Sequence, residues 1–146
     1  MTNKKVFTVD ERPVYVYDGL FDHQENIEIY TDINQRPFIR SNLDNPLYTT
    51  KDTFINWSCL LRQPDPLLNL LNDRYLSCIE ELNDCKVDFQ RQYINFSTTE
   101  TVDLMHVDSR LEAVNEYTIL QYANFTWDKN WHGETVFYTN QGDEIL

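Results

Sequence analysis

The hydrophobic pattern of this chain changes its period near residue 86, and this change constrains the fold more than any other feature. Before it, apolar residues recur every three or four positions over residues 67–82, which predicts an amphipathic helix. Pro66 suits the first position of that helix. After it, residues 87–96 follow a period of two, which predicts a strand. The chain is therefore expected to place helices before the strands of a sheet.

Shorter signals place further elements in the N-terminal half. Residues 14–17 are β-branched and aromatic, so they predict a strand, and shorter strands are expected near residues 38–39 and 53–61. Asp22 is followed three residues later by Glu25, which is a capping-box pattern and predicts a helix of about three turns. The expected buried stripe of that helix consists of Ile27, Tyr30 and Ile33.

The C-terminal half reads as successive short strands. Strands are expected at residues 104–108, 116–124 and 133–138, and a turn at residues 140–143 precedes another strand that begins at residue 144. Helices followed by antiparallel strands predict an α+β fold in which a β-sandwich or jelly roll carries the chemistry. We interpret the chain as one domain.

Composition excludes several classes of function. The 146 residues carry 12 Lys and Arg against 24 Asp and Glu, a formal charge of −12, which argues against nucleic-acid and anionic-membrane partners. The balance permits a cationic partner, a metal ion or simple solubility. No run reaches the roughly 18 apolar residues of a membrane span, and no signal peptide is evident, so a cytoplasmic protein is expected. The three cysteines are expected to be free thiols.

His106 and Asp108 form the pattern with the clearest chemistry. Side chains two residues apart on a strand project to the same face, so the imidazole and the carboxylate can converge on one point. They would supply two of the three ligands of a two-His-one-carboxylate iron site. The neighbours Met105 and Val107 are apolar and would face the core. Taken alone, the tripeptide is also compatible with a surface histidine beside an aspartate.

The residues that follow extend the pattern. Tyr122-Ala-Asn124 ends an expected strand, Trp127 comes three residues later, and His132-Gly133-Glu134 precedes the next strand. This order resembles the iron(II)- and 2-oxoglutarate-dependent dioxygenases of the prolyl-4-hydroxylase-like branch. The resemblance covers most of the chain and is most specific over residues 104–138. Residues 14–25 are also similar to the opening strand and helix of that family.

The resemblance implies roles for particular residues. His106 and Asp108 would hold Fe(II), while Tyr122 and Asn95 would bind the co-substrate 2-oxoglutarate, which is oxidised to succinate and carbon dioxide as the substrate is hydroxylated. The substrate would be a peptide, a protein side chain or a small molecule. Simpler interpretations stay open, because Tyr122 could fill the barrel interior and the tryptophans could pack their loop. The expected substrate-site residues are Tyr93, Arg110 and Trp127.

The resemblance also implies a division of the domain. Residues 1–86 would support the first strands of a double-stranded β-helix, the jelly roll, at residues 87–146. That jelly roll looks incomplete at its C-terminal end, because it needs eight strands. Three explanations are open: the chain is a fragment, a partner chain completes the sheet, or the protein is a relative that has lost catalysis.

Several positions depart from the family pattern. Phe96 replaces a frequent tyrosine, and His132 stands where the family has a glycine, so His132 is not taken as a ligand. His23 is expected on the surface of a helix. Neither the distal histidine nor the co-substrate arginine of the family follows His132 in this sequence. The alternative functions are therefore a non-catalytic jelly-roll protein with a structural or interaction role, and a cupin-like metal enzyme that does not use 2-oxoglutarate.

Overall fold

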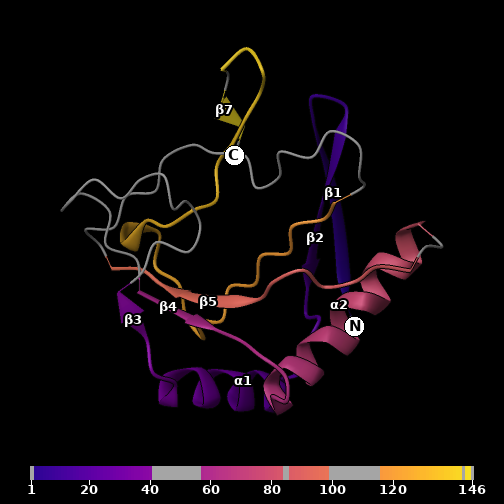
Figure 1. Cartoon of the computed structure of the whole chain (residues 1–146). Coiled ribbons are helices and arrows are strands. Elements are labelled where there is room, and N and C mark those ends of the chain that lie inside the picture. The colour runs from indigo at the N-terminus through magenta and orange to yellow at the C-terminus, as the bar shows by residue number, and fades with distance from the viewer. Residues whose placement is uncertain (1, 41–56, 84–85, 99–115, 143, 146) are drawn as a thin grey trace.

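A computed structural model describes the following residues of the chain: 2–40, 57–83, 86–98, 116–142 and 144–145. Within these ranges the protein forms two α-helices and three small antiparallel sheets (Figure 1). The predicted α+β class is thereby confirmed. Neither α-helix is long and apolar enough to cross a membrane.

The first sheet is a hairpin of two seven-residue strands. β1 (Asn3–Val9) pairs with β2 (Arg12–Asp18) through a two-residue turn, in which Asp10 and Glu11 both have positive φ. β2 contains the predicted strand at residues 14–17, which is confirmed. β1 was not predicted, because its side chains are mostly exposed and include two lysines. Pairing with β2, and not burial, gives β1 its conformation.

The first helix, α1 (His23–Gln35), begins where the sequence predicts it. The Asp22 carboxylate accepts a hydrogen bond from the Glu25 amide at 2.8 Å, and the Glu25 carboxylate accepts one from the Asp22 amide at 2.8 Å. This reciprocal arrangement confirms the capping box. Glu25 also pairs with Arg74, whose guanidinium lowers the pKa of this carboxyl.

The predicted buried face of α1 is correct at Ile33, which packs against the core, and wrong at Tyr30. Ile29 is only 2% exposed, whereas Tyr30 is 40% exposed and lies with its ring centroid 4.8 Å from that of Phe125. Ile27 and Ile33 are only half-buried. The aliphatic side chain of Ile29 needs no hydrogen-bond partner in the core, whereas Tyr30 stays partly exposed.

The second helix, α2 (Pro66–Asn83), confirms the strongest sequence prediction. It runs diagonally beside the three-stranded sheet of β3 (Ile39–Arg40), β4 (Trp57–Leu60) and β5 (Tyr93–Phe96), arranged in the order β3-β4-β5, and α1 lies below that sheet in the view of Figure 1. The hydrophobic core consists of residues from both helices together with Phe21, which precedes α1, and Leu61, which follows β4: Phe21, Ile29, Leu61, Leu67, Leu68, Leu71 and Tyr75.

One ion pair joins the two helices at their ends. The Arg36 guanidinium donates to both carboxylate oxygens of Asp65, at 2.6 and 2.9 Å, and also to Asp32. Asp65 in turn accepts a hydrogen bond from the Leu67 amide at 3.0 Å, so it caps the first turn of α2. The Arg36 guanidinium holds the pKa of the Asp65 carboxyl below its usual value.

The predicted strands of the C-terminal half are shorter than expected. Of residues 87–96, only β5 pairs with another strand. Of residues 133–138, only β6 (Phe137–Tyr138) does so, with β7 (Glu144–Ile145). The turn between them is confirmed, since the Gly142 amide donates to the Thr139 carbonyl at 2.9 Å and Gly142 has a φ of +87°.

Residues 116–124 are irregular in the structure, so the predicted strand at this place is wrong. Its side chains still alternate near the end, where Gln121 and Ala123 are half-buried and Tyr122 is exposed. Gln121 accepts a hydrogen bond from the buried Tyr75 hydroxyl, and Ala123 packs against the core. The pattern of burial is that of a strand, but within the described ranges no neighbouring strand forms a ladder with it.

The described strands therefore belong to three separate sheets, and they do not by themselves make the expected jelly roll. The expected strand at residues 104–108 and part of the one at residues 53–61 lie outside the described residues.

Candidate functional site

The predicted metal ligands His106 and Asp108, and the predicted substrate residue Arg110, lie outside the described residues. Among the residues that the structure does describe, no group of three His, Cys, Asp or Glu side chains could hold a metal ion. The predicted residues whose surroundings can be followed lie at two places, on β5 and along residues 122–135.

A short turn organises the second of these places. The 3-10 turn η1 (Lys129–Trp131) begins at Asp128, whose carboxylate accepts hydrogen bonds from the amide and the side chain of Asn130 at 2.9 and 2.8 Å. The Trp131 amide donates to the Asp128 carbonyl at 2.8 Å. This turn reverses the chain and brings Trp131 back beside Trp127.

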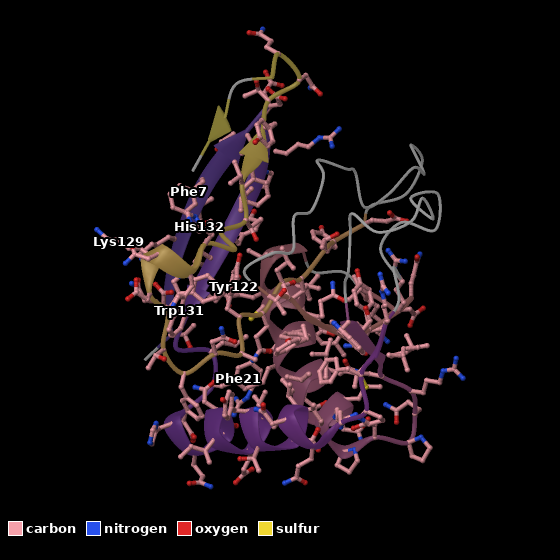
Figure 2. The ribbon with its side chains drawn as sticks, turned by 90° about the vertical axis from the view of Figure 1, so that its left-hand side faces the viewer. Phe7, Phe21, Tyr122, Lys129, Trp131 and His132 are labelled. Atoms are coloured by element: carbon pink, nitrogen blue, oxygen red, sulfur yellow. The ribbon has the colours of Figure 1, made fainter. Side chains whose placement is uncertain are left out.

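Three aromatic residues meet at this turn, and we call them the aromatic cluster: Tyr122, Trp127 and Trp131. The ring centroids of Tyr122 and Trp127 are 5.9 Å apart at an angle of 71°, and those of Trp127 and Trp131 are 6.3 Å apart at 72°. The Tyr122 hydroxyl is hydrogen-bonded to Thr135 Oγ1. Figure 2 labels Tyr122 and Trp131 on the C-terminal stretch of the chain.

The cluster is open to solvent. The exposed fractions of Tyr122, Trp127 and Trp131 are 57%, 46% and 49%. The interpretation of Tyr122 as an interior filler is therefore wrong in this structure. The tryptophans do pack their own loop, as the simpler interpretation expected, but each leaves about half its surface free.

The backbone beside the cluster adopts two conformations that favour glycine. His132 has φ 57° and ψ −160°, a region that is essentially restricted to glycine, and Gly133 has φ +88°. A Cβ atom at Gly133 would lie 3.0 Å from Cη2 of Trp127. The loop thus requires glycine at residue 133 and strains the histidine at residue 132.

We expect the substitution His132→Gly to stabilise the protein by about 1 kcal/mol. Relief of the strained backbone is worth roughly 1–3 kcal/mol, and the greater freedom of glycine in the unfolded chain offsets about 0.5–1 kcal/mol of that gain. Urea denaturation followed by circular dichroism measures the change.

The matched variant is Gly133→Ala, which should act in the opposite direction and destabilise the protein by roughly 1–3 kcal/mol. The new methyl group would also displace Trp127 and alter tryptophan emission. Equal effects of the two substitutions would contradict the described loop geometry.

The other predicted residues lie on β5. Asn95 Oδ1 accepts a hydrogen bond from the hydroxyl of Ser58, which is completely buried, at 3.0 Å. The Arg91 guanidinium lies 5.4 Å from the ring centroid of Tyr93. Phe96, the departure from the family pattern, is exposed and its ring centroid is 5.9 Å from that of Phe38. Asn95 thus serves the packing of β4 against β5 through Ser58.

Sequence reasoning missed Thr135 as the partner of Tyr122, because no local pattern links residues thirteen positions apart. It also treated Trp131 only as a packing residue.

Comparison with known proteins gives no match to a family model, a curated protein or a solved structure. The described residues form an α+β protein with a solvent-exposed aromatic cluster and, beside it, the hydroxyl groups of Tyr122 and Thr135.

Proposed function

We propose that this chain is part of an iron(II)- and 2-oxoglutarate-dependent oxygenase of the prolyl-4-hydroxylase-like branch. The observation that carries the proposal is the association of three residues on which the sequence resemblance rests. Tyr122, Trp127 and Gly133 come from separate motifs, yet Trp127 contacts the ring of Tyr122 and abuts Gly133. The glycine-favouring backbone at His132 also suits the glycine that the family has at that position.

The donor set fits Fe(II) by its chemistry. A neutral imidazole and a carboxylate, as in His106 and Asp108, are ligands of non-heme iron in facial sites. These two residues would hold the metal, and we assign no third ligand. When bound, the iron and 2-oxoglutarate supply the oxidising chemistry of substrate hydroxylation.

The described residues would contribute binding and orientation. The hydroxyls of Tyr122 and Thr135 are bonded to each other and both residues are exposed, so the hydroxyl whose proton is not used in that bond can donate a hydrogen bond to a carboxylate of the co-substrate. Asn95 would assist from β5, and Tyr93, Arg110 and Trp127 would contact the substrate. The substrate class stays open between a peptide or protein and a small molecule.

We also propose a jelly-roll fold, a cellular location and a partner class for the protein. Residues 1–86 would support a jelly roll that begins at residue 87. We propose a cytoplasmic location and no nucleic-acid or membrane partner, which agrees with the charge of −12.

The test is the production of succinate from 2-oxoglutarate by the purified chain with Fe(II) and oxygen. We expect iron-dependent turnover that falls by about a hundredfold or more in His106→Ala and in Asp108→Ala, because loss of a ligand costs at least as much as loss of a supporting partner. Tyr122→Phe should raise the KM for 2-oxoglutarate and change kcat less.

The matched control is His23→Ala, which removes an exposed histidine from the first turn of α1. It should leave turnover unchanged. Absence of iron-dependent succinate in the unmodified protein, or full turnover in His106→Ala, would refute the proposal.

A second candidate is a non-catalytic interaction protein. It is favoured by residues 116–124, where Ile119 and Leu120 are exposed and no described strand pairs with the backbone. A strand of another chain could add there. This candidate predicts neither Fe(II) binding nor turnover, together with association detected by light scattering.

A further inference from the structure

We infer that the aromatic cluster of Tyr122, Trp127 and Trp131 is a binding site for an organic cation that carries a quaternary ammonium group. The inference rests on ring geometry and charge alone, and it does not depend on the proposed oxygenase activity. The rings stand nearly perpendicular to one another and remain about half exposed. Such an arrangement suits a cation that touches several ring faces at once.

The distances between the ring centroids allow one cation to contact neighbouring rings. A cation is attracted by an aromatic ring when it lies within about 6 Å of the ring centroid. Centroids that are 5.9 and 6.3 Å apart allow one cation to satisfy that condition for neighbouring rings. The angles of 71° and 72° make both pairs edge-to-face, so the rings do not stack and their electron-rich faces point in different directions.

The cation–ring contacts found in the described ranges all lie outside the cluster. Elsewhere, Lys4 Nζ lies 5.2 Å from the ring centroid of Tyr15, and the Arg91 guanidinium lies over Tyr93. Within the described residues no lysine or arginine covers a ring of the cluster, although Lys129 belongs to the same turn. In Figure 2 the Lys129 side chain points outward, away from Tyr122.

The charge of the surroundings favours a cationic ligand. The chain has a formal charge of −12, and the loop itself contributes the carboxylates of Asp128 and Glu134 against the single ammonium group of Lys129. A quaternary ammonium ion is weakly hydrated compared with a primary amine, so it loses less hydration when it contacts the rings.

The cluster is also held in place before any ligand binds. Thr135 fixes the Tyr122 hydroxyl, the hydrogen bonds of Asp128 fix the turn that carries Trp131, and Gly133 allows Trp127 to approach the backbone. Little side-chain freedom therefore remains to be lost on binding, which favours affinity.

The experiment compares choline with its neutral isostere 3,3-dimethylbutan-1-ol by fluorescence titration. The protein carries Trp57→Phe, so that emission comes only from the two tryptophans of the cluster. We expect saturable quenching by choline in the millimolar range, as is typical of solvent-exposed cation–π sites, and at least tenfold weaker binding of the neutral compound. Sodium chloride at equal ionic strength should not reproduce the quenching.

Variants locate the site. In ligand-detected NMR of the choline methyl groups, Trp127→Leu and Trp131→Leu should each weaken binding about three- to thirtyfold. Lys129→Gln should tighten it about twofold, because it removes the like charge. Phe96→Leu, which removes an exposed ring from β5, should have no effect.

Circular dichroism establishes that each variant is folded. Three results would each overturn the inference: equal binding of choline and its neutral isostere, quenching that does not saturate, or unchanged choline binding in both folded single variants, Trp127→Leu and Trp131→Leu. Succinate production is not measured in this experiment, so its outcome is separate from that of the oxygenase test.

Discussion

The substitution Asp65→Ala is expected to lower the free energy of unfolding by about 3 kcal/mol. The side chains of Arg36 and Asp65 are only 17% and 12% exposed, so removal of the carboxylate leaves a largely buried guanidinium with Asp32 as its remaining ion-pair partner in the described structure. The same change removes the acceptor for the Leu67 amide at the start of α2. Urea denaturation followed by far-UV circular dichroism measures the loss.

The control is an ion pair of similar length on the surface. Lys5 Nζ lies 3.0 Å from Asp18 Oδ2, and both side chains are 56% exposed. Asp18→Ala should therefore cost less than about 1 kcal/mol, because solvent screens the pair. If Asp65→Ala cost no more than Asp18→Ala, the proposed role of Asp65 at the joint between α1 and α2 would be wrong.

The contribution of Asp65 should also depend on pH. Its pKa is lowered by the hydrogen bonds from Arg36, so the folded protein holds the proton less tightly than the unfolded chain. The stabilisation is therefore complete above the ordinary carboxyl value of 3.8 and is lost as the pH falls below it. The difference between the wild type and Asp65→Ala should shrink over that acidic range and remain constant near neutrality.

The second large effect is expected at Ile29. Truncation to alanine should cost about 3 kcal/mol, because the side chain is 2% exposed and its removal leaves a cavity between the helices. The matched variant Ile27→Ala deletes the same atoms from a half-buried position of α1 and should cost about 1 kcal/mol. If Ile27→Ala instead lowered the free energy of unfolding more than Ile29→Ala, the buried face predicted from the sequence would be correct.

Local signals in the sequence were sufficient to predict the helices. The capping box of Asp22 and Glu25 satisfies backbone groups three residues apart, and the apolar period of α2 runs over residues 67–82, so both could be found without tertiary information. The choice of Ile29 over Tyr30 could not, because it depends on which side of α1 meets α2.

Strands were harder to predict because a strand forms only when a second strand hydrogen-bonds to its backbone, and the local sequence does not identify that second strand. Residues 116–124 have the composition and partly the alternation of a strand, yet they pair with no described strand. β1 has the opposite character, since it is largely exposed and pairs fully with β2. At the candidate site, Tyr122 and Trp127 were predicted from motif order, but their contact and the bond to Thr135 depend on the turn at Asp128.

The tip of the first hairpin has a consequence for the order of assembly. Asp10, in the turn between β1 and β2, accepts a hydrogen bond from the backbone amide of Asn140, which lies 130 residues later in the sequence. Closing a loop of that length costs roughly 4 kcal/mol of chain entropy, whereas the hairpin itself closes over two residues. During synthesis the hairpin can therefore form before residue 140 has been made, and the junction with Asn140 can form only afterwards.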